Sequence, residues 1–135
     1  APLLEAATSE MLASGDYDRH LRRLKRRIAE GIAAVVARVK ASFPPGTRVN
    51  VPEAGFLLWV ELPPQVNALE VHRRALARGI GVSPGPLFSP GAELTHFLRL
   101  NCANEPTPRL LTAVEQIGAL CHELAAFTPD SPATR

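Results

Sequence analysis

One long helical pattern, from Asp16 to about Ser42, limits the shapes open to this chain of 135 residues. Apolar residues recur along it every three or four positions, Asp16 can cap its start, and the sequence FPPG at 43–46 stops it. A helix of this length, at about 1.5 Å per residue, measures about 40 Å. A compact domain of this size has a radius of gyration of only about 14 Å. We therefore expect the helix to cross the full width of the domain or overhang it, and to contact more than this chain.

The first part of the same helix is strongly basic. Six of the nine residues in RHLRRLKRR, at 19–27, are Lys or Arg, and the apolar stripe Leu21, Leu24 and Ile28 lies between them. Three interpretations of this basic face stay open: a solvated surface, a contact between domains, or a surface for nucleic acid. The net charge of +2 is too balanced to indicate nucleic-acid binding by itself.

The rest of the chain predicts a small sheet with helices packed on it. TRVNV at 47–51 and GFLLWVEL at 55–62 read as a hairpin around PEAG, and the second strand is apolar enough that both of its faces should be covered. The other predicted elements are a first helix at 2–13, a helix from 68 to near Gly79, strands at 80–82 (IGV) and 96–102 (HFLRLNC), and a last helix after NEPTP. The order is α-α-β-β-α-β-β-α. This is an α+β fold with a small antiparallel or mixed β-sheet packed against helices.

We expect one domain over residues 1–128, with a long helical part at 1–43, the sheet and its helices at 47–128, and a flexible tail at 129–135. No apolar run approaches the roughly 20 residues of a bilayer span, and the first residues lack the pattern of a signal peptide. A cytoplasmic location without a membrane partner is the expectation. The chain opens on Ala-Pro within a helical pattern, which predicts that it is the C-terminal piece of a longer protein.

The residues with reactive side chains give little sign of chemistry by this chain alone. Cys102 and Cys121 form no CxxC pair, so we expect two reduced, buried thiols. The only lysines, Lys25 and Lys40, lie on the long helix in contexts that would not activate an amine for imine formation. We therefore expect no catalytic residue and no metal site, since the four histidines are dispersed: His20, His72, His96 and His122.

The strand HFLRLNC places Arg99 at its centre, with Phe97 and Asn101 on the same side. An unpaired charge among apolar residues is costly, so this arginine needs a partner if it is buried. A guanidinium can hold the carboxylate of a ligand through two parallel hydrogen bonds. It can equally form an internal salt bridge to Glu61 or Glu93, and the residues alone leave both possibilities open.

Taken in order, AGFLLWVELP at 54–63, GIGVSPGPLFSPG at 79–91 and FLRLNCA at 97–103 resemble the C-terminal small domain of the fold type I pyridoxal phosphate aminotransferases. The resemblance covers nearly the whole chain. YDRHLRRLKRR, from Tyr17, together with FLRLNCA is similar, within that superfamily, to the MocR-type regulators of the GntR family. In those regulators a winged-helix DNA-binding domain precedes an aminotransferase-like domain.

The resemblance implies roles for particular residues. Arg99 matches the carboxylate-binding arginine of the family, Pro84 and Gly85 should border the mouth of the pocket, and Asn101 should lie near Arg99. The lysine that binds pyridoxal phosphate and the groups that hold its phosphate belong to the large domain, which this sequence does not contain. The cofactor is thus expected in the full-length protein and not on this chain.

The function expected from this likeness is that of a small domain which closes over an amino-acid pocket in a regulator that is a homodimer when full length. DNA would be bound only through a missing N-terminal domain. A genuine class I or II aminotransferase is the alternative, so whether the parent is an enzyme stays open. A third possibility is a self-sufficient domain that binds nucleic acid through its basic helix.

Overall fold

The computed structural model describes residues 15–52 and 55–127. The helix expected at 2–13 and the tail expected at 129–135 lie outside these residues. The elements, in order, are α2 (Asp16–Ser42), β1 (Arg48–Asn50), β2 (Leu57–Glu61), α3 (Ala68–Ala77), β3 (Ser83–Pro84), the 3₁₀ turn η1 (Gly85–Leu87), β4 (Phe97–Asn101) and α4 (Pro108–Ala126).

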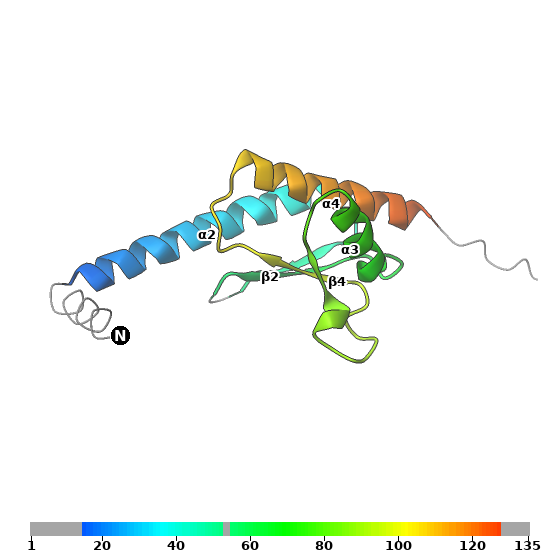
Figure 1. Cartoon of the computed structure of the whole chain (residues 1–135), viewed down its shortest axis with the longest axis horizontal. Helices are drawn as coiled ribbons and strands as arrows, with labels where there is room; N and C mark the ends of the chain where they lie inside the picture. Colours follow the sequence, from blue (N-terminus) through cyan, green and yellow to red (C-terminus); the bar gives the residue numbers. More distant parts are fainter. Residues whose placement is uncertain (1–14, 53–54, 128–135) are drawn as a thin grey trace, which may run out of the picture.

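The strands form one sheet in the order β1-β2-β4-β3, and every neighbouring pair is antiparallel. α2 and α4 run beside each other on one side of this sheet, and α3 lies at its far end (Figure 1). The predicted α+β fold, with a small sheet packed against helices, is therefore confirmed, and the sheet is antiparallel rather than mixed.

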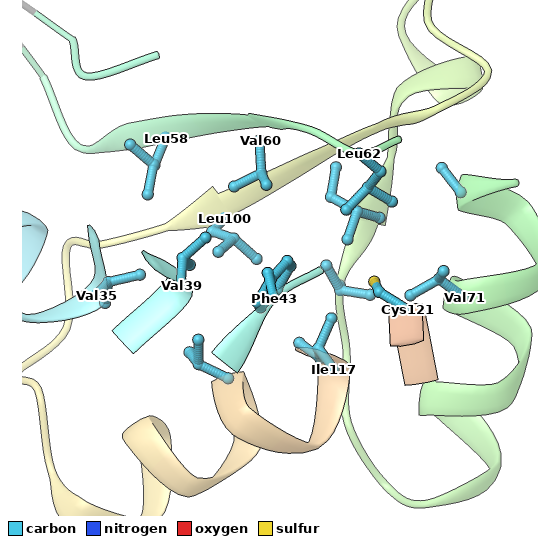
Figure 2. Packing of buried hydrophobic residues seen from close by; sticks show 14 of the residues in the cluster. Val35, Val39, Phe43, Leu58, Val60, Leu62, Val71, Leu100, Ile117 and Cys121 are labelled. Carbon is cyan, nitrogen blue, oxygen red and sulfur yellow. The ribbon is translucent and has the colours of Figure 1, made fainter. Parts of the chain in front are cut away.

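The core lies between the sheet and the helices. Burial alternates along β2, where Leu58 and Val60 are fully buried and the residues between them are not. Figure 2 shows these two side chains and Leu100 of β4 directed toward residues from all three helices: Val35 and Val39 of α2 with Phe43 just after it, Val71 of α3, and Ile117 and Cys121 of α4. Burying each such aliphatic side chain stabilises the fold by about 1.5–3 kcal/mol.

Helix α2 spans 27 residues and ends at Ser42, as the sequence predicts. Its second half is anchored by the buried residues Ile32, Val35 and Val39, whereas residues 16–30 are exposed or half-buried. Figure 1 shows this first half extending past the sheet, so the predicted overhang is confirmed. The prediction that Asp16 caps the helix is wrong, because Gly15 holds the cap position at φ 77°.

Helices α2 and α4 approach each other closely because one position on α4 is a glycine. A Cβ atom at Gly118 would lie 2.7 Å from the carbonyl oxygen of Ser42 and 2.9 Å from the ring of Phe43. A salt bridge between Arg38 of α2 and Glu115 of α4 flanks this contact. The backbone at the end of α2 is thus in direct contact with the backbone of α4 at Gly118.

The short strand predicted at 80–82 is shifted, and β3 consists of Ser83–Pro84. Two hydrogen bonds explain the shift, since both tie the preceding segment to α3. The amide of Ile80 donates to the carbonyl of Ala75 at 2.9 Å, and Nδ1 of His72 donates to the carbonyl of Val82 at 2.8 Å. Two backbone groups that a ladder could use, the amide of Ile80 and the carbonyl of Val82, are therefore bonded to the helix.

Within the described residues the second strand is fully covered on one face and only partly covered on the other. On the side away from the helices, Leu57, Trp59 and Glu61 are only half-buried. The apolar side chains of Leu57 and Trp59 gave the strand its continuous hydrophobic appearance. This second side of the sheet, called the open face below, carries Arg99.

The two cysteines are free and buried, as predicted. Across residues 15–52 and 55–127, no helix combines the length and the apolar character that crossing a membrane requires. The same part of the chain holds no group of three or more His, Cys, Asp or Glu arranged to bind a metal ion.

Candidate ligand-binding site

Arg99 stands at the centre of the open face. The sheet register pairs it with Trp59 on β2 and with Ser83 on β3. Residues paired directly across a ladder share a face, so these side chains surround Arg99 on both flanks. The arginine is half-buried in this position.

Aromatic rings form the immediate surroundings of this arginine. Its Cζ atom lies over the ring of Phe88, 3.7 Å from the ring centroid. Phe88 meets Trp59 edge to face, with centroids 5.6 Å apart, and Trp59 meets Phe97 in the same manner at 6.4 Å. We call these three residues the aromatic frame. A cation over an aromatic face is stabilised by about 0.5–2 kcal/mol, depending on how far it is desolvated.

Neither acid that the sequence offered as an internal partner binds Arg99. Oε1 of Glu61 lies 3.2 Å from Nε2 of His96, and Oε2 of Glu93 accepts a hydrogen bond from Ser89 at 3.0 Å. Among the described residues no carboxylate forms a salt bridge with Arg99 and no acceptor receives its N–H groups. Every buried side-chain nitrogen in this part of the chain has a hydrogen-bond partner. The guanidinium nitrogens of Arg99 have none there, so they are not buried and reach solvent.

The loop between η1 and β4 carries Phe88 to its place. Gly85, the first residue of η1, is buried, and a Cβ atom there would lie 2.2 Å from the carbonyl oxygen of Leu94. The amide of Phe88 donates to the carbonyl of Gly85 at 2.9 Å, and the amide of Phe97 donates to that of Leu94 at 3.1 Å. The loop is thus folded tightly on itself, and it projects from the side of the sheet opposite α2 and α4 (Figure 1).

The structure brings only some of the predicted pocket residues to Arg99. Pro84 is fully buried and pairs with Leu98, so its ring faces the helices rather than the open face. Gly85 is buried against the Leu94 carbonyl. Asn101 shares the side of Arg99, but its Oδ1 accepts a hydrogen bond from the amide of Ala103 at 2.9 Å. Whether any of them touches a ligand stays a prediction.

Sequence reasoning placed Phe97 on the side of Arg99 but missed Trp59 and Phe88. Alternation along the paired strand could have placed Trp59 there as well, because it lies directly across the ladder from Arg99. Phe88 had no such signal, since its position depends on how an irregular, proline-rich loop folds.

The described residues place no amine for pyridoxal phosphate beside Arg99. Imine formation needs an amine, and the only lysines of the chain are Lys25 and Lys40. Both are exposed on α2, which packs against the opposite side of the sheet from Arg99. No lysine therefore shares the open face with Arg99.

Comparison with known proteins agrees with the architecture. The family model for class I and II aminotransferases matches residues 1–117. This chain belongs to the class I and II aminotransferase family. The likeness expected from the sequence motifs, to aminotransferase-like small domains, is therefore confirmed.

The relatives of this family member include proteins named as regulators. The uncharacterized HTH-type transcriptional regulator YdcR of Escherichia coli is 33% identical over 120 residues, which cover 89% of this chain and 26% of that protein. A second such regulator of the same organism, YjiR, is 32% identical over 117 residues, covering 87% and 25%. The chain thus spans about a quarter of the length of these curated relatives.

Solved structures show the same fold. The α-aminoadipate aminotransferase LysN of Thermus thermophilus, complexed with N-(5'-phosphopyridoxyl)-L-leucine, superposes with a TM-score of 0.75 at 28% identity. The match covers 88% of this family member and 30% of that enzyme chain. The described domain therefore corresponds to under a third of a complete aminotransferase.

Proposed function

We propose that this chain is the C-terminal small domain of a pyridoxal phosphate-dependent MocR-type transcriptional regulator, and that Arg99 binds the α-carboxylate of its amino-acid ligand. In this proposal residues 1–128 form the small domain and 129–135 its tail. The observation that carries it is the position of Arg99 on the open face, with its charge unneutralised by any described acid.

The chemistry of the arginine fits a carboxylate. Guanidinium and carboxylate are planar groups that join through two parallel, charge-assisted hydrogen bonds. Such bonds contribute about 1.5–3 kcal/mol each to binding or stability. An arginine held at a half-buried site by aromatic rings is partly desolvated already, so the carboxylate would meet a donor that needs little reorganisation.

The remaining parts of the regulator belong to the proposal as well. A large domain of the parent would hold pyridoxal phosphate and face the open side of the sheet, and the small domain would close over the shared pocket as a hinged unit. DNA would be bound by an N-terminal domain, in a cytoplasmic homodimer. The likeness to YdcR and YjiR, both named as HTH-type transcriptional regulators, supports this version.

A genuine aminotransferase is the second candidate, and the structural match to LysN favours it. The same arginine would then position a substrate for proton transfer. The sequence of the parent reading frame separates the two candidates, since a winged-helix domain is expected only in the regulator. Turnover of an amino acid with a 2-oxo acid gives the matching biochemical readout.

The carboxylate role is tested by binding measurements on the parent protein with an α-amino acid and with the amine that lacks only its carboxylate. Arg99→Ala should weaken binding of the amino acid about tenfold or more, which corresponds to about 1.4 kcal/mol, and leave the amine nearly unchanged. Arg48→Ala is the matched control, because Arg48 is an exposed arginine on β1, two strands from β4. Equal losses for both ligands in Arg99→Ala would contradict the proposal.

A further inference from the structure

We infer that Phe88 is a positioning residue for Arg99: its ring covers one face of the guanidinium and leaves the N–H edge directed to the ligand carboxylate. This inference rests on the proposed function of Arg99. It adds a residue from the loop after η1 to a site otherwise built on strands.

The geometry of the contact keeps the hydrogen-bond donors available. The N–H bonds of a guanidinium lie in its plane, so a ring over its face consumes none of them. The distance of 3.7 Å from Cζ to the Phe88 centroid is ordinary van der Waals contact between carbon atoms. Consistent with this, no described residue accepts a hydrogen bond from Arg99.

An aromatic partner also leaves the positive charge of Arg99 unneutralised, whereas an acidic partner would neutralise it. A glutamate in this place would form the same paired hydrogen bonds as a ligand carboxylate and would compete with it. The two nearest candidates are otherwise engaged, Glu61 with His96 and Glu93 with Ser89. The ring of Phe88 thus orders the arginine without occupying its binding edge.

Phe88 is itself fixed from two directions. Trp59 supports its ring edge to face at 5.6 Å, with the two planes inclined at 83°. The backbone of Phe88 is held by the hydrogen bond from its amide to the carbonyl of Gly85. Gly85 has no side chain, which lets the Leu94 carbonyl pack directly against it. The arginine therefore meets a ring that is itself held by contacts, although 41% of Phe88 is exposed, and less rotamer freedom of Arg99 remains to be lost when a ligand binds.

The test replaces Phe88 in the parent protein by phenylalanines with one, two and three ring fluorines, which weaken the attraction of the ring for a cation while keeping its shape. The Kd of an α-amino acid should rise stepwise along the series, about threefold or more at trifluorophenylalanine, whereas the Kd of the matched amine should stay constant. Phe88→Trp should retain binding and Phe88→Leu should weaken it. The same fluorinated series at Phe127, an exposed residue after α4, is the control.

The outcomes are distinguishable. An amino-acid Kd that does not respond to fluorination, in a protein where Arg99→Ala still abolishes the preference for the carboxylate, overturns the positioning role and leaves the proposed function intact. Equal losses of amino acid and amine in Arg99→Ala reject the proposed function, and the positioning role with it. Melting temperatures measured on each variant separate a loss of folding from a loss of binding.

Discussion

Trp59 and Arg99 are direct neighbours across the β2–β4 ladder, and the Trp59 ring supports the phenylalanine that lies over the guanidinium. One strand pair therefore positions both the charge and the aromatic surface that orders it.

Replacing Gly85 by alanine should lower the free energy of unfolding by about 1–3 kcal/mol, because the new methyl group would overlap the Leu94 carbonyl. Urea denaturation of the chain measures the change. Gly81→Ala is the control: a Cβ atom at Gly81 meets nothing within 4 Å, so its effect should stay within about 0.5 kcal/mol. Equal midpoints for the two variants would show that the loop is not folded as described.

Gly118→Ala should also destabilise the chain, by about 1–3 kcal/mol, since its methyl group would separate α4 from the end of α2 at Ser42. Gln116→Ala, at an exposed position of the same helix, serves for comparison. The prediction fails if thermal denaturation finds the glycine variant as stable as the glutamine variant.

Both thiols should be unreactive while the chain is folded. Burial raises the pKa of the Cys121 thiol to about 12 and that of Cys102 above its usual value, so at pH 8 almost no thiolate forms. A colorimetric disulfide reagent should therefore label neither cysteine in the native chain and both in urea. Rapid labelling without urea would mean that the α4 side of the core opens readily.

Acid should remove stability that depends on Glu70. Hydrogen bonds from Arg73 and then Arg74 lower the pKa of this carboxyl from 4.5 to about 2, so the folded state keeps it ionised where the unfolded state protonates it. The contribution is complete above about pH 4.5 and is lost as the pH falls toward 2. Glu70→Gln should thus flatten the decline of urea midpoints across this window. Glu105→Gln, at an exposed site, should leave the decline as it is in the original chain.

The parts of the fold that could be predicted from the sequence are those where the spacing of apolar residues fits only one type of secondary structure. α2 ends at Ser42 as expected, because apolar spacing and two prolines agree about where a helix must stop. The strand of Arg99 was likewise found, since its alternation is regular. These features depend on local geometry, which the sequence records directly.

Features set by contacts distant in sequence were missed. The segment 80–82 bonds to His72 instead of entering the sheet, and Pro84 faces the core because β3 pairs with Leu98. The apolar run of β2 suggested two covered faces, yet one of them is an aromatic surface beside Arg99. Phe88 joins that surface only through the folded loop, and no pattern along the chain reports that folding.

The most direct test of the central claim is a crystal structure of the parent protein with its amino-acid ligand bound. Two nearly parallel N–H···O bonds of about 2.7–2.9 Å should join the Arg99 guanidinium to the ligand carboxylate, with the Phe88 ring still over Cζ. A carboxylate bound elsewhere, with Arg99 making no contact to the ligand, would contradict the account.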